Sequence, residues 1–123
     1  MKAFKKPQIN RQDALNSKPL KNRDVQESLL ETGEVLLSYP VRVRPWAASL
    51  IKRFGGSPHG TRNKKLQLDT LGTAVWKLID GNRSVRDVIR VFSEQHQLHP
   101  REAEVAVTQF LRELGKRGLI GLK

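Results

Sequence analysis

Three amphipathic helices between residues 69 and 118 are the feature that most constrains the fold of this chain. The segment LGTAVWKLIDGNRSV, from Leu71 to Val85, predicts a helix with a tryptophan, an end at Asp80-Gly81 and a new helix start at Ser84. Apolar residues recur at helical spacing here and again before Gly118, so each helix has one face to bury. The predicted faces are Leu71, Val75, Leu78 and Ile79; Val85, Val88, Ile89 and Phe92; and Ala103, Val107, Phe110, Leu111 and Leu114.

The ends of these helices carry recognisable capping residues. Asp69 precedes the first helix and can accept a backbone N–H, and Gly81 can adopt the left-handed conformation that ends it. Ser84 followed by Asp87 is an approximate capping box for the second helix. Pro100 suits the first position of the third. These signals predict the helix boundaries.

The region before the helices has the patterns of strands and of two shorter helices. Apolar and polar residues alternate over residues 35–43, which predicts a half-buried strand, with Pro40 at an edge or bend. A second short strand is expected at Leu66 and Leu68, after a basic loop, SPHGTRNKK. Helices are expected over residues 22–33, ending at Gly33, and over 45–54. The tail LIGL predicts a last short strand.

Together these elements predict an α+β fold of winged-helix-like outline, a small antiparallel sheet followed by a three-helix unit. Residues 34–123 form the expected domain, and residues 1–33 an N-terminal arm with weak helical content. The chain has no cysteine, and no apolar run exceeds three residues, which excludes a disulfide framework and predicts no membrane span. No secretory signal is recognised, so a cytoplasmic location is expected.

The positive charge is concentrated in the first half of the chain. Residues 1–65 hold 14 Lys and Arg against 5 Asp and Glu, whereas residues 66–123 hold 9 against 7. A DNA-reading helix needs exposed cations, because phosphate neutralisation supplies most of the affinity. The second helix exposes Arg86 and Arg90 against Asp87 and Glu94, and the third begins with acidic residues. The three predicted helices, joined by short turns, have the outline of a DNA-binding helix-turn-helix. We interpret this helix-turn-helix outline as structural and do not expect it to bind DNA.

No pattern of catalytic or metal-binding residues is found in the sequence. His96 and His99 are three residues apart but straddle a helix end, and no third ligand lies near them. Phosphate-binding glycine motifs, paired carboxylates and Ser-His-Asp arrangements do not occur. We expect no catalytic residues, no metal and no cofactor.

Two stretches, KLQLDTLGTAVWKLIDGNRSVRDVI and EAEVAVTQFLRELGKRGLIGL, resemble the PqqD-like family. These are small peptide chaperones of pyrroloquinoline quinone biosynthesis and their relatives, also called RiPP recognition elements. The resemblance covers roughly residues 64–121. The residues that carry it are Leu66, Leu68, Gly72, Val75-Trp76, Ile79-Asp80-Gly81, Ser84-Val85, Phe110-Leu111, Leu114 and Gly118-Leu119.

The resemblance implies a non-enzymatic protein that binds the leader of a ribosomally made precursor peptide and presents it to a modifying enzyme, often a radical-SAM protein. In such relatives the leader adds a strand to the sheet and lies against the third helix. Carried onto this sequence, the expected peptide-binding residues are Lys65, Leu66, Gln67 and Leu68 on the strand, and Val105, Thr108, Gln109 and Arg112 on the helix. Lys64 and Lys65 either attract an acidic leader or protect the edge against aggregation.

Two functions of other classes remain open on the sequence alone. One hypothesis is that the basic N-terminal half and the loop at residues 57–65 bind nucleic acid. The predicted helix at 45–54 has the composition of one that lies on an anionic membrane surface or docks on an acidic protein, although packing on the preceding strand is the favoured interpretation. Edge strands also pair between copies, so both a monomer and a homodimer are compatible with the sequence.

Overall fold

The computed structural model describes residues 11–42 and 61–123, and within it the chain divides into two compact units. We call them the helical unit (residues 11–22 and 74–123) and the sheet unit (residues 23–42 and 61–73). The predicted helix at 45–54 lies outside the described residues. The described chain is an α+β protein, as expected. The winged-helix outline and the division at residue 33 stay predictions.

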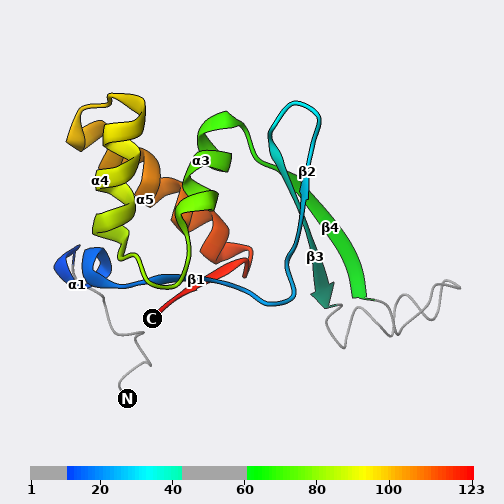
Figure 1. Ribbon diagram of the computed structural model, residues 1–123. Helices are drawn as coiled ribbons and strands as arrows, with labels where there is room; N and C mark the ends of the chain where they lie inside the picture. The colour runs from blue at the N-terminus through cyan, green and yellow to red at the C-terminus, as the bar shows by residue number, and fades with distance from the viewer. Residues whose placement is uncertain (1–10, 43–60) are drawn as a thin grey trace, which may run out of the picture. The chain divides into compact units, whose positions relative to one another are not determined.

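The sheet unit is a three-stranded antiparallel sheet in the order β2-β3-β4 (Figure 1). The strands are β2 (Gln26–Leu29), β3 (Val35–Arg42) and β4 (Thr61–Gln67). A tight turn joins β2 to β3: the Leu30 N–H donates to the Glu34 carbonyl at 2.9 Å, and Gly33 has φ +88°. The helix predicted over residues 22–33 is therefore wrong. Its weak local signal is overridden because β2 satisfies backbone groups of β3.

Strand β3 follows the predicted alternation, with Val35, Leu37 and Tyr39 buried. Strand β4 is longer than the sequence indicated, because its register with β3 runs without a break from Thr61 opposite Arg42 to Gln67 opposite Leu36. The predicted loop is thus a strand from residue 61 onward. A basic composition suits an exposed edge strand as well as a loop, so the long partner strand decides the conformation.

A buried hydroxyl group closes the end of this sheet. The Leu68 N–H donates to the Val35 carbonyl at 2.8 Å, but the Val35 N–H donates to the Thr73 Oγ1 at 3.0 Å. The same Oγ1 lies 3.5 Å from the Leu68 carbonyl oxygen, to which it donates. Thr73 is 5% exposed and lies in α3 (Thr70–Leu78). Its hydroxyl group therefore lies between the Val35 N–H and the Leu68 carbonyl and takes the place of a direct hydrogen bond at the end of the β3–β4 ladder.

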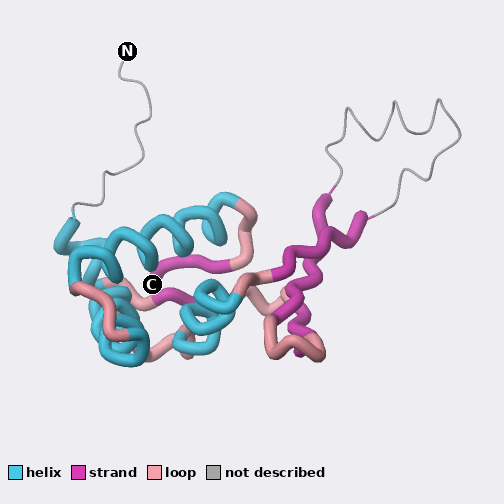
Figure 2. The backbone as a smooth tube through the Cα atoms, turned by 90° about the horizontal axis from the view of Figure 1, so that it is seen from above, coloured by secondary structure: helices cyan, strands magenta, loops and turns pink. Residues whose placement is uncertain are grey.

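The helical unit contains α4 (Val85–His96) and α5 (Pro100–Lys116), with the end of α3, a short α1 (Arg11–Asn16) and a two-stranded ribbon. The ribbon pairs β1 (Pro19–Lys21) with β5 (Ile120–Leu122) in antiparallel register, which confirms the predicted last strand. In Figure 2 the strand that ends at the C-terminus lies between β1 and α5. Residues 11–22, part of the predicted arm, thus supply a helix and a strand to this unit.

The predicted helix caps are present. Asp69 Oδ1 accepts from the Gly72 N–H at 2.6 Å, and Ser84 and Asp87 form a reciprocal capping box. Gly81 has φ +82°, a conformation that strains other residues, and a Cβ there would lie 2.8 Å from Leu20 Cδ2, so the end of the Leu20 side chain would have to shift. The Lys21 ammonium lies 4.6 Å from the centroid of the buried Trp76 ring.

The core of the helical unit follows the predicted faces with one exception on α5. The face of α4 is buried as predicted, and Ala103, Val107, Leu111 and Leu114 are buried on α5. Phe110, expected in the core, is only half-buried because it lies about 60° around the helix from Val107.

On α3, Leu71 is 48% exposed and not part of a buried stripe. The other three residues of the predicted face, Val75, Leu78 and Ile79, are buried as expected. Trp76, which the predicted face did not include, is fully buried as well.

Candidate functional site

The expected peptide-binding residues fall into two groups, one in each unit. Lys65, Leu66 and Gln67 lie at the end of β4 and Leu68 directly follows it, all within the sheet unit. Val105, Thr108, Gln109 and Arg112 lie on α5 in the helical unit.

Strand β4 is at one margin of the sheet, and its pairing leaves one side of its backbone without a strand partner among the described residues. The Leu68–Val35 bond fixes the alternation: Leu66 and Leu68 direct their N–H and C=O groups to β3. Lys65 and Gln67 therefore direct theirs to the outer edge. The Leu30–Glu34 bond on the other side of β3 gives the same alternation, because it assigns even-numbered residues of β3 to β2.

The side chains of this segment divide between the two faces of the sheet. Leu68 is buried and Leu66 is half-buried on the core face, so they support the strand. Lys65 and Gln67 are exposed on the other face, where the Gln67 Nε2 donates to Glu34 Oε1 at 3.2 Å. Any contact with a guest strand at this edge thus runs through the backbone and exposed side chains of Lys65 and Gln67.

A cavity of about 670 Å³ lies on the α5 side of the helical unit. It is lined by α1, the first residue of α4, one face of α5 and all of β5, and we call it the α5–β5 groove. Of the four predicted residues of α5, Thr108 and Arg112 line it. Val105, 42% exposed, and Gln109 point further around the helix and do not.

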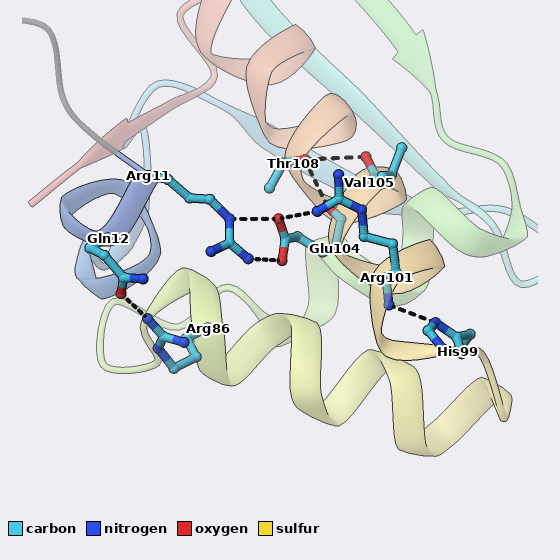
Figure 3. A network of polar contacts seen from close by, with 8 residues as sticks. All are labelled: Arg11, Gln12, Arg86, His99, Arg101, Glu104, Val105 and Thr108. Atoms are coloured by element: carbon cyan, nitrogen blue, oxygen red, sulfur yellow. Dashed lines mark hydrogen bonds and ion pairs between the residues drawn. The ribbon is translucent and has the colours of Figure 1, made fainter.

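An ion pair joins α1 to α5 beside this groove (Figure 3). The Arg11 guanidinium donates to both carboxylate oxygens of Glu104, at 2.6 and 3.1 Å. These hydrogen bonds lower the pKa of Glu104 below its ordinary value, against a smaller opposing effect of desolvation. Arg101 lies 3.7 Å from the same carboxylate, so Glu104 is held by two cations.

The model of one family, described as coenzyme PQQ synthesis protein D (PqqD), matches residues 47–120, more than half of the chain. The chain belongs to the PqqD family. Proteins of this family are peptide-binding partners in the biosynthesis of pyrroloquinoline quinone and of other ribosomally made, modified peptides. No curated protein and no solved structure matches the chain significantly.

The PqqD match covers β4, α3, α4 and α5 and ends at the first residue of β5. Strands β2 and β3, helix α1 and strand β1 all precede it. Ten groove residues were not predicted as part of a site, and half of them lie outside the PqqD match: Arg11, Ala14 and Leu15 on α1, and Gly121 and Leu122 on β5. A signal for Leu122 was available, because the tail LIGL was expected as a strand; α1 gave only weak helical periodicity.

The two histidines with sequence spacing of interest have local structural contacts. The His96 ring lies 4.7 Å from the Phe92 ring, and His99 caps α5 by accepting from the Arg101 N–H at 3.1 Å. In the part of the chain that the structure describes, no group of three His, Cys, Asp or Glu side chains is arranged to hold a metal ion. None of its helices is long and apolar enough to cross a membrane.

Both exposed arginines of α4 have partners within the protein. Arg86 donates to Gln12 Oε1 at 2.8 Å, and Arg90 lies 3.7 Å from Glu94. Contacts of this kind occupy the exposed cations of α4, in keeping with our interpretation that the outline is architectural.

Proposed function

We propose that this PqqD-family protein is a non-enzymatic chaperone that captures the leader of a ribosomally made precursor peptide by strand addition to the outer edge of β4. In this role it presents the peptide to a modifying enzyme, of the radical-SAM type. The observation that carries the proposal is the alternation of β4, which turns the backbone groups of Lys65 and Gln67 to an edge with no described strand partner. Family membership supplies the class of ligand.

The energetics indicate what a leader must contribute. Four backbone hydrogen bonds, two each at Lys65 and Gln67, contribute about 2–6 kcal/mol at about 0.5–1.5 kcal/mol each. Micromolar binding requires about 8 kcal/mol. Side-chain contacts must supply the difference, which is how a strand-adding site distinguishes one peptide from another.

The charge near this edge favours an acidic leader. Lys64 and Lys65 are both exposed, and neither has an ion pair with a described residue. Edge lysines also protect strands from self-pairing, so the two roles are compatible: the charge excludes another copy of the basic strand and attracts an acidic one.

A tagged pull-down from native lysate at moderate salt, with and without nuclease, is the direct test. Mass spectrometry should identify a short peptide and its modifying enzyme in the nuclease-treated sample. Addition of the captured peptide should slow amide hydrogen exchange at Lys65 and Gln67. Nucleic acid alone, lost on nuclease treatment and with steep salt dependence, would instead assign the function to the basic N-terminal half.

Variants of Gln67 separate strand addition from side-chain contact. Gln67→Pro removes an outward N–H and should abolish binding of the captured peptide without breaking the β3 ladder. Gln67→Ala keeps the N–H and serves as the matched control. Equal affinity of the wild type and Gln67→Pro would refute capture at this edge.

The predicted contribution of α5 has its own variant. Val105→Asp places a charge on an exposed apolar position and should leave stability nearly unchanged. If Val105 is part of the peptide-binding surface, as the family resemblance implies, the variant loses the captured peptide. Unchanged affinity removes Val105 from the site.

A further inference from the structure

Strand β5 has an edge of its own, on the side away from β1. Lys18 and Lys123 exchange backbone hydrogen bonds of 3.1 and 2.9 Å, and the Asn22 N–H donates to the Leu119 carbonyl at 2.9 Å. In an antiparallel pair such bonded positions alternate, so Gly121 is the residue of β5 that bonds to β1. Ile120 and Leu122 therefore direct their N–H and C=O groups away from β1, and no hydrogen bond to them is found within residues 11–42 and 61–123.

The α5–β5 groove lies directly beside this edge. Its lining is mainly apolar, with Leu15, Val85 and Leu111 contributed by the three helices and Ile120 and Leu122 by the strand. Leu122 is 47% exposed although it lines the groove. A cavity of about 670 Å³ has the size of ordinary ligand sites, and an apolar groove beside unpaired backbone groups has the form of a strand-accepting site.

One cation that lines the groove has no counterion among the described residues. Arg112 is exposed, lines the groove and forms no ion pair or hydrogen bond with a described residue. Glu104, the acidic residue of the lining, is already held by Arg11 and Arg101. The groove thus combines unused backbone groups, apolar walls and one cation available to a carboxylate.

We propose that the α5–β5 groove is a second peptide site, separate from the β4 edge, for an extended acidic segment. The segment pairs with Ile120 and Leu122, places an apolar side chain in the cavity and a carboxylate on Arg112. A second copy of this chain fits less well, because the strand it would supply, Ile120–Leu122, has no acidic side chain and would bring a second Arg112 to the groove. The groove depends on α1 and on Leu122, which lie outside the PqqD match.

Selection from a phage-displayed library of random twelve-residue peptides tests this proposal with the full chain as bait. We expect one class of selected peptides to combine acidic and aliphatic residues and to slow amide exchange at Ile120 and Leu122. Arg112→Glu should weaken this class by about tenfold or more, as the loss of a paired charge does. Lys77→Glu, the same charge change at an exposed position of α3 outside the groove, should not.

The backbone contribution is tested at Leu122. Leu122→Pro removes an outward N–H and leaves the bonds of β5 to β1 intact, so it should abolish binding of this class. Leu122→Ala keeps the N–H and should weaken binding less. Circular dichroism of each variant checks that the fold is retained.

The outcomes distinguish this site from the one on β4. Peptides of the proposed class should bind Gln67→Pro as tightly as the wild type. The proposal is overturned if every selected peptide tolerates both Arg112→Glu and Leu122→Pro. It is also overturned if Ile120 and Leu122 become protected with rising protein concentration alone while sedimentation shows a dimer, because a second copy then occupies the groove.

Discussion

Replacement of Thr73 by valine should destabilise the sheet unit although the two side chains have nearly the same shape. The Thr73 Oγ1 is the acceptor for the Val35 N–H at 3.0 Å, and it is buried. Thr73→Val removes this acceptor and leaves a buried N–H unsatisfied, which costs about 1–3 kcal/mol. The contact of the hydroxyl with the Leu68 carbonyl, at 3.5 Å, is too long to add much.

Urea unfolding followed by circular dichroism measures this loss, and two control variants isolate its cause. Thr73→Ser keeps the hydroxyl and loses one methyl group, so it should cost less, about 0.8 kcal/mol. Thr70→Val makes the same chemical change at an exposed position of α3 and should be nearly neutral. A second readout is hydrogen exchange at the Leu68 amide, which should become faster in Thr73→Val.

The reasoning is refuted if Thr73→Val and wild type unfold with the same free energy, within about 0.5 kcal/mol, the range of neutral surface changes. That result would mean that the Val35 N–H finds another partner or water. If Thr73→Ser proved as costly as Thr73→Val, packing of the methyl group would be the cause instead of the hydrogen bond to the hydroxyl.

Three further predictions concern the helical unit. Ser84→Ala breaks the capping box of α4 and should cost about 0.5–2 kcal/mol in thermal or urea unfolding; no loss would contradict the cap. Leu114→Ala should lower the free energy of unfolding by about 2–5 kcal/mol, because Leu114 is buried. Phe110→Ala should lower it by less than the about 3–5 kcal/mol typical of a buried phenylalanine, and by less than Leu114→Ala. A larger loss for Phe110→Ala than for Leu114→Ala in urea unfolding would place Phe110 in the core. The pKa values of Asp87 and Glu104 are lowered, by hydrogen bonds from Ser84 and from Arg11 respectively, so stability present above their unfolded values of about 4 should fall as the pH drops further. Urea midpoints between pH 6 and 3 measure this, and a Glu104→Gln variant should show a smaller fall than the wild type.

Local signals predicted the parts of the fold that depend on neighbours in sequence. The caps at Asp69 and Ser84 and the buried face of α4 follow from spacing alone, because the interacting atoms are within one helical turn. Strand β2 and the N-terminal part of β4 were missed because their conformation depends on pairing with β3. Pairing across the sequence overrides a weak local preference.

The candidate sites also divide into a part that local sequence signals predict and a part that depends on contacts between distant segments. The alternation of Leu66 and Leu68 predicts a strand, and the family resemblance implies that its edge accepts a peptide. In the structure the backbone groups of Lys65 and Gln67 face the outer edge of this strand. The α5–β5 groove could not be predicted, because it requires α1 and β5 to meet, and these elements are about a hundred residues apart. The position of Arg112 on α5 follows from the sequence, but the cavity beside it does not.

The pairing of β1 with β5 has a consequence for the order in which the protein folds. The rung between Lys18 and Lys123 closes a loop that contains nearly the whole chain, and long loops form slowly because their closure costs entropy before any contact repays it. During synthesis β1 has no strand partner until residues 120–122 have left the ribosome. The ribbon should therefore form after the folding transition state, and substitutions in it should mainly accelerate unfolding.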